Sequence, residues 1–136
     1  MALPAKAATI GQTWPLLTVQ DIEHSVAFYR DHLGFAVCGR AADADGRLFW
    51  CRLERGGSSL MLQQADKEDG PTEDRGRGVA LYFICDDVDA VHAELAAFGL
   101  RVEAPRVTTY GMKQLFVPEP DGYEICFESP TEDWAG

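Results

Sequence analysis

A weak internal repeat constrains the fold of this chain more than any other feature. Residues 17–22 (LTVQDI) and 83–88 (FICDDV) each form a short apolar stretch that runs into an aspartate. An aspartate at that place caps a helix, because its carboxylate accepts hydrogen bonds from the first free backbone N–H groups. The two stretches are about 66 residues apart, which indicates two copies of one small unit.

An amphipathic helix is predicted after each aspartate. The residues that recur at helical spacing are Ile22, Val26, Tyr29 and Leu33 in the first copy, and Val88, Val91, Leu95 and Phe98 in the second. Side chains at this spacing lie on one side of a helix and pack against a core. Gly34 and Gly99 follow directly and suit the left-handed position that ends a helix.

Three strands are predicted after each helix, so each copy has the order βαβββ. They cover residues 35–39, 47–54 and 58–64 in the first copy, and 100–103, 114–117 and 123–128 in the second. Gly-rich and Asp-rich turns separate them. The predicted fold is α+β, with two tandem βαβββ modules forming a cupped mixed sheet. We expect one domain over 1–136, with modules at about 13–65 and 79–129, a charged linker at 66–78 and a tail at 130–136.

Charge and cysteine content narrow the possible partners. The net charge of −10 comes from 22 acidic and 12 basic residues, which disfavours nucleic acid, whose phosphates need Lys and Arg partners. An acidic surface serves solubility and would favour a cationic ligand over an anionic one. Four cysteines lie in apolar runs without a C-x-x-C pair, as is typical of a reduced, cytoplasmic protein. No segment is apolar enough to predict a membrane span or a secretory signal.

Three stretches carry a resemblance to a known family. They are residues 17–21 with 25–29 and 33–35, residues 79–83 leading to 86–90, and residues 110–113 followed by 120–123. Together they are similar to the vicinal-oxygen-chelate superfamily, the glyoxalase, bleomycin-resistance and dioxygenase family. One such fold supports many functions, so the resemblance predicts the architecture more firmly than the activity.

The resemblance also implies where enzymes of this family bind a divalent metal. The four equivalent positions are Trp14, Met61, Ala80 and Cys126. These are not the His and carboxylate ligands that such ions prefer. The three histidines, His24, His32 and His92, fall on the predicted helices, and we expect them to face solvent. We therefore expect no metal and no cofactor, as in the bleomycin-resistance-like members, which are similar in having a proline at the position of Pro15.

Strand alternation predicts a ligand-binding cup on the sheet face away from the helices. The side chains expected to line it are Trp14, Trp50, Met61, Gln63, Tyr82, Tyr110, Met112, Gln114, Phe116 and Cys126. Such a mixture of aromatic and apolar groups with a few polar ones is typical of small-molecule pockets. The alternative is that these aromatic residues fill a protein interface or a small core. Cys126 has no basic partner in the sequence, and we identify no catalytic residues.

Three functions follow as hypotheses. The first is a metal-free, bleomycin-resistance-type protein that sequesters an aromatic, preferentially cationic, drug or antibiotic. The second is a glyoxalase-like isomerase, lyase or dioxygenase-type enzyme acting on a small molecule. The third is a domain that serves assembly alone. We also expect a homodimer, because Pro15 suits an edge or crossing strand and relatives cover such sheet edges with a second chain.

Overall fold

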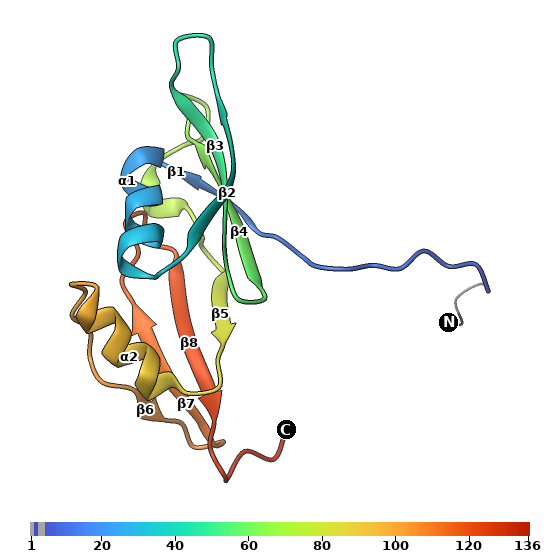
Figure 1. Ribbon diagram of the computed structural model, residues 1–136, viewed down its shortest axis with the longest axis vertical. Helices are drawn as coiled ribbons and strands as arrows, with labels where there is room; N and C mark the ends of the chain where they lie inside the picture. The colour runs from blue at the N-terminus through green and yellow to red at the C-terminus, as the bar shows by residue number, and fades with distance from the viewer. Residues whose placement is uncertain (1, 3–4) are drawn as a thin grey trace.

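The chain folds into two similar halves placed one after the other along the long axis of the molecule (Figure 1). The structure is a computed structural model, and it describes residues 2 and 5–136. Its elements are β1 (Leu16–Val19), α1 (Ile22–Ala27), the π-helical turn η1 (Phe28–His32), β2 (Ala36–Ala42), β3 (Leu48–Arg55), β4 (Ser58–Gln64), the 3-10 turn η2 (Thr72–Asp74), β5 (Ala80–Ile84), α2 (Val88–Ala97), β6 (Arg106–Val107), β7 (Met112–Val117) and β8 (Glu124–Pro130).

Each half contains a four-stranded mixed sheet with a helix on one side. The strand order is β1-β4-β3-β2 in the first sheet, here called sheet one, and β5-β8-β7-β6 in the second, called sheet two. In both sheets the first strand pairs in parallel with the last, and the other pairs are antiparallel. The predicted α+β fold of two βαβββ modules is therefore confirmed. Figure 1 shows α1 and α2 on the same side of the molecule.

The predicted helix boundaries are confirmed by their capping contacts. Asp21 accepts a hydrogen bond at Oδ1 from the backbone N–H of His24 (3.2 Å), and Asp87 accepts one from Ala90 (3.1 Å). Gly34 and Gly99 end the two helical segments with φ of 75° and 83°, a conformation that residues with a Cβ rarely adopt. The first helix differs from the expectation in one respect, because its last turn widens into η1.

A single apolar core lies beneath both sheets and joins the two modules. Phe35 of module one contacts Phe83 of module two with ring centroids 5.5 Å apart, and Phe83 stacks on Phe127 at 5.2 Å. Arg55 bridges the same junction, because it donates to the carbonyl of Leu33 and to the carboxylate of Glu94. The modules therefore pack through their helix-covered sides, and the opposite side of each sheet stays open.

The connection after α2 does not follow the prediction. A strand was expected at 100–103, whereas the observed strand β6 contains only Arg106 and Val107, which pair with Gln114 and Lys113. Pro105 lies directly before β6. Because it has no backbone N–H to donate, the strand does not extend back past residue 106. In the described part of the chain, no helix has the length and apolar character needed to cross a membrane.

Candidate functional site

Four of the residues predicted to line the cup lie on the open face of sheet one. Leu17, Val19, Leu60 and Leu62 are buried on the helix side, so alternation places Trp14, Met61, Gln63 and Trp50 on the open side. The strand register brings Met61 beside Leu16, and Gln63 beside both Thr18 and Trp50. Gln63 donates to Thr18 Oγ1 at 2.9 Å. Gln12, Trp14 and Met61 line an open hollow of about 460 Å³.

Other residues predicted to line the cup lie in sheet two. Tyr82, Cys126 and Phe116 form one row across β5, β8 and β7. Tyr82 and Phe116 are 44% and 48% exposed, whereas Cys126 is fully buried between them. Met112 is also buried, at the start of β7 beside the tail. Both were expected to line the cup, and their burial removes them from its accessible surface.

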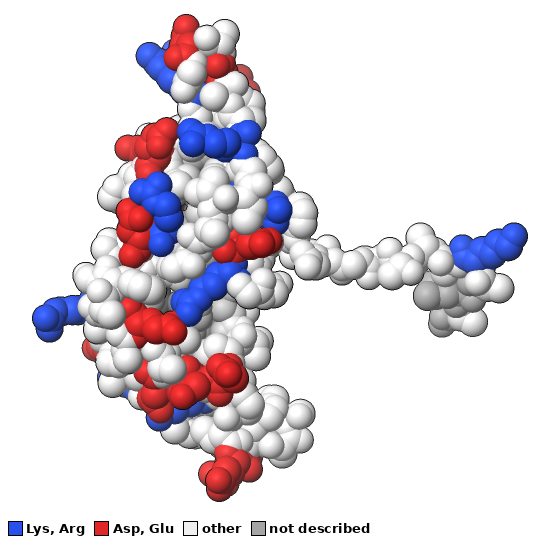
Figure 2. All heavy atoms as spheres, viewed as in Figure 1, with Lys and Arg blue, Asp and Glu red and all other residues white. Residues whose placement is uncertain are grey.

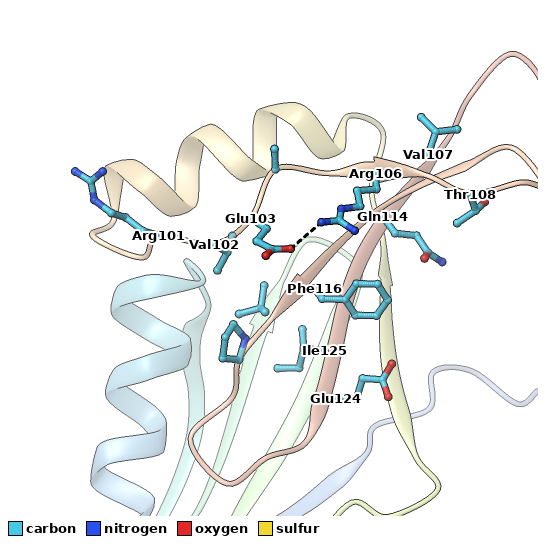
Figure 3. A pocket seen from close by; sticks show the side chains of 13 residues that line it. Arg101, Val102, Glu103, Arg106, Val107, Thr108, Gln114, Phe116, Glu124 and Ile125 are labelled. Atoms are coloured by element: carbon cyan, nitrogen blue, oxygen red, sulfur yellow. Dashed lines mark hydrogen bonds and ion pairs between the residues drawn. The ribbon is translucent and has the colours of Figure 1, made fainter.

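A larger hollow of about 700 Å³ lies at the outer edge of sheet two. It lies between the connection at residues 101–104 and the strands β6, β7 and β8. Phe116 and Gln114 project from β7 into the same region, and Val102 and Ile125 supply apolar walls (Figure 3). The ion pair between Arg106 and Glu103 (3.3 Å) lies at the exposed rim. Among the predicted site residues, this hollow includes Gln114 and Phe116.

In the described part of the chain, Trp14 with Met61 and Gln114 with Phe116 line different hollows. The hollow beside Trp14 is lined by residues before and in sheet one, and the hollow beside Phe116 by residues that belong to module two. The expected cup with Trp14, Trp50, Tyr82 and Phe116 on common walls is therefore divided into two half-sites. The physical reason is the packing of the modules through their helix-covered sides, which leaves each open face separate.

The loop that contains Tyr110, one of the residues expected to line the cup, packs against the C-terminal tail. The Tyr110 and Trp134 rings lie 6.0 Å apart, edge to face. The Tyr110 hydroxyl also accepts a hydrogen bond from Gln114 Nε2 at 2.9 Å. Gly111 permits the close approach, because a Cβ there would lie 2.7 Å from the backbone of Asp133 and Trp134. Trp134 is thus part of the structure beside the half-site and not a free tail residue.

The donor set at the family's metal positions does not fit a divalent ion. Trp14 and Ala80 offer no ligand atom, Met61 offers a thioether, and Cys126 offers a buried thiol. Burial, followed by the negative charge of Glu128, raises the pKa of the Cys126 thiol to about 11, which disfavours the thiolate that binds metals. Within residues 2 and 5–136, no group of three or more His, Cys, Asp or Glu side chains could hold an ion.

The histidines lie away from both open faces, but two of them are more structural than expected. His24 is exposed, as predicted. His32 and His92 are half-buried, and their rings hydrogen-bond to the carbonyls of Phe98 (2.8 Å) and Val102 (3.1 Å). The prediction that all three face solvent is wrong for these two, because the turn after α2 folds back over them.

Sequence reasoning missed one functional candidate on sheet one. Arg52 lies on the open face between Met61 and Gly39 in the register, and its guanidinium carbon is 4.4 Å from the centre of the Trp14 ring. Its position two residues after Trp50 on an alternating strand was the available signal. Figure 2 shows acidic and basic side chains interspersed over the face in view. The net charge of −10 therefore does not give the charge at any one place on the surface.

The fold and these faces define the class of protein. The model of the Glyoxalase/Bleomycin resistance protein/Dioxygenase superfamily matches residues 10–127, so the chain belongs to this family. A comparison with curated protein sequences found no significant match.

Solved structures agree on the fold and include ligand-binding proteins. A glyoxalase/bleomycin resistance protein/dioxygenase from Nocardioides is 20% identical with a TM-score of 0.68, covering 96% of this chain and 89% of that one. TnmS3, an antibiotic binding protein from Streptomyces sp. CB03234, is 26% identical with a TM-score of 0.64, covering 91% and 100%. A bleomycin resistance determinant encoded on the transposon Tn5 is 22% identical with a TM-score of 0.65, covering 90% and 99%.

Proposed function

We propose that this protein binds an aromatic small molecule, of the drug or antibiotic kind, and sequesters it without chemical change. The observation that carries the proposal is the aromatic side chains on the open side of each sheet, with Trp14 beside a hollow of about 460 Å³ and Phe116 beside one of about 700 Å³. A hollow of this size that combines an aromatic side chain with apolar and polar neighbours suits a planar organic ligand.

Similarity to antibiotic-binding proteins supports this proposal over the enzymatic alternative. TnmS3 shares 26% of its sequence with this chain along its whole length. The donor set at the family's metal positions favours metal-free binding, since Trp14 and Ala80 supply no ligand atoms. The buried Cys126 thiol, with its raised pKa, is a poor nucleophile for covalent catalysis.

The proposal includes a homodimer, because at each half-site a single chain would cover the ligand from one side only. Leu16, Ile84 and Val79 on or beside the open faces are 46%, 66% and 56% exposed. Exposed apolar groups of this extent mark interaction surfaces. A second copy related by a two-fold axis would place sheet one of one protomer opposite sheet two of its partner. The ligand would then lie between two aromatic walls, in a protein that we expect to work in the cytoplasm.

The test is a thermal-shift screen against aromatic antibiotics, followed by recovery of the bound compound. A ligand that binds only the folded state raises the melting temperature. We expect at least one planar compound to do so and mass spectrometry to recover it unchanged in stoichiometric amount. A recovered compound of altered mass would favour the enzyme of the same family. No shift with any compound at saturating concentration would favour the domain that serves assembly.

A further inference from the structure

Arg52 occupies the centre of the open face of sheet one. Its register neighbours are Met61 on β4 and Gly39 on β2, and Trp50 and Glu54 are the residues two positions away along β3. Its side chain is 21% exposed, compared with 49% for Glu54. The cation is therefore partly buried, with Met61 and Trp14 on one side and the carboxylate of Glu54 on the other, and water screens it less than at a fully exposed site.

The contacts of the Arg52 guanidinium fix its orientation, but only one of its three nitrogen atoms donates hydrogen bonds to residues that the structure describes. Its carbon lies 4.4 Å from the centre of the Trp14 ring, a cation–π contact. Nη1 donates to Glu54 Oε2 at 3.2 Å and to Ser59 Oγ at 3.1 Å. Among the described residues, Nε and Nη2 have no hydrogen-bond partner. The edge that carries these two nitrogens presents parallel N–H donors, the geometry that binds both oxygens of a carboxylate.

An aromatic surface continues on the other side of Arg52. The Trp50 ring lies over Gly39, where a Cβ would be 3.3 Å from the ring atom Cζ3 and 3.9 Å from Arg52 Cβ. The missing side chain at position 39 thus lets the Trp50 indole lie close to the sheet next to Arg52. Trp14, Arg52 and Trp50 are here called the Arg52 platform: the guanidinium contacts the Trp14 ring, and Trp50 lies two residues away on the same face of β3.

From this arrangement we infer that the ligand is a planar aromatic acid. Its carboxylate accepts hydrogen bonds from Nε and Nη2 of Arg52, and its ring stacks on Trp50. This inference rests on the proposed binding function and names the ligand class for it. The net charge of the chain favours a cation at long range, but a hydrogen-bonded ion pair at contact distance determines which ligand stays bound.

The experiment compares three probes that share one ring system: anthraquinone-2-carboxylate, its neutral carboxamide, and cationic 2-(aminomethyl)anthraquinone. Each is titrated into the full-length protein by calorimetry. We expect the acid to bind about tenfold or more tightly than the amide, since an ion-paired bidentate contact exceeds a neutral one, and the cation to bind most weakly.

Variants assign the preference to Arg52. Arg52→Gln should weaken binding of the acid by about tenfold and leave the amide unchanged. Arg52→Lys should recover part of the loss, because a lysine keeps the charge but not the paired donors. Arg40→Gln is the matched control, since Arg40 pairs with the helix-facing Cys51, and it should bind all three probes like the wild type. Melting curves confirm that each variant is folded.

The outcomes separate the ligand class from the binding function. Equal affinity for all three probes, unchanged by Arg52→Gln, would leave the binding function standing and overturn the acid. Tightest binding of the cation would also overturn it. Failure of all three probes to bind would count against both the ligand class and the aromatic-binding function. Selective loss of the acid in Arg52→Gln, with the amide and Arg40→Gln unaffected, would support the inference.

Discussion

Arg75 Nη1 lies 3.2 Å from Asp121 Oδ1, and the two side chains are 6% and 4% exposed. Arg75 belongs to the segment between the modules, and Asp121 to the turn between β7 and β8. Asp121 also accepts a hydrogen bond from the backbone N–H of Gln20 at 2.9 Å. A buried ion pair therefore ties the connecting segment and module two to the start of α1.

Removing Arg75 should destabilise the fold. Arg75→Met leaves the Asp121 carboxylate buried without its cation, and loss of one partner of a buried pair costs about 3–5 kcal/mol. Because Gln20 and Ser25 still contact Asp121, we expect about 2–4 kcal/mol from the same principle. Urea unfolding measures this loss. The exposed Arg77 provides the control variant Arg77→Met, and an equal loss in both variants would contradict the role of the ion pair.

Glu119 should make stability depend on pH. Burial, followed by repulsion from Asp121, raises the pKa of Glu119 from 4.5 to about 7. The folded state then binds this proton more tightly than the unfolded state. The associated stability is present below about pH 4.5 and is lost as pH rises through about 7. By linkage the difference is on the order of 3 kcal/mol.

Glu119→Gln tests this dependence. In the wild type, Oε1 and Oε2 of Glu119 accept from the backbone N–H groups of Asp121 and Tyr123 at 2.8 and 3.2 Å. The glutamine keeps one acceptor oxygen and so retains one of these two hydrogen bonds, a loss that does not depend on pH. We expect the variant to gain stability relative to the wild type between pH 5 and 8 and to show a constant difference above that range. The measurement is the free energy of unfolding at a series of pH values. Parallel curves for the two proteins would show that Glu119 titrates normally.

Trp50→Ala should weaken ligand binding without unfolding the protein. An aromatic anchor of this kind contributes about 2 kcal/mol or more, which is roughly thirtyfold in Kd. Trp50→Phe should keep most of the affinity. Val37→Ala is the control, since Val37 is exposed and pairs with the helix-facing Leu53. The measurement is calorimetric titration, and equal affinity for the wild type and Trp50→Ala would contradict the site. Trp134 is unsuitable as a control because it packs on Tyr110.

Chelation should leave the protein unchanged. Trp14, Met61, Ala80 and Cys126 do not form a ligand set that divalent ions prefer. We therefore expect purified protein to contain no stoichiometric zinc, nickel, manganese or iron, and EDTA to leave its melting temperature unaltered. Elemental analysis and a thermal melt measure the two quantities. One tightly held equivalent of metal would refute the metal-free proposal.

Light scattering should give twice the chain mass of 15.0 kDa at micromolar concentration. Leu16→Asp places a charge on the open face of sheet one and should produce a folded monomer, because burying an unpaired carboxylate in an interface is costly. Ala93→Asp lies on the exposed side of α2 and should remain dimeric. A monomeric wild type would contradict the proposed dimer, as would a Leu16→Asp variant that stays dimeric.

The elements that could be predicted from sequence are those whose cause is local. The capping aspartates Asp21 and Asp87 and the terminating Gly34 and Gly99 act within one helical turn, so their residue types sufficed. The alternation of Leu60 and Leu62 with Met61 and Gln63 correctly separated the two faces of β4, because the period of a strand is a property of its own backbone. Where an element depended on a neighbour across the sheet, as at 100–103, the prediction was wrong.

The site depended on packing between segments far apart in the chain. Arg75 and Asp121 are 46 residues apart in sequence, and no pattern around either one specifies the other. The burial of Cys126 follows from Tyr82 and Phe116 on the two neighbouring strands, and the division of the cup into two half-sites follows from how the modules dock. Sequence periodicity determined which side chains face away from the helices. Only the tertiary structure decided which of them meet, because that is set by the docking of whole sheets and not by the spacing of residues along one strand.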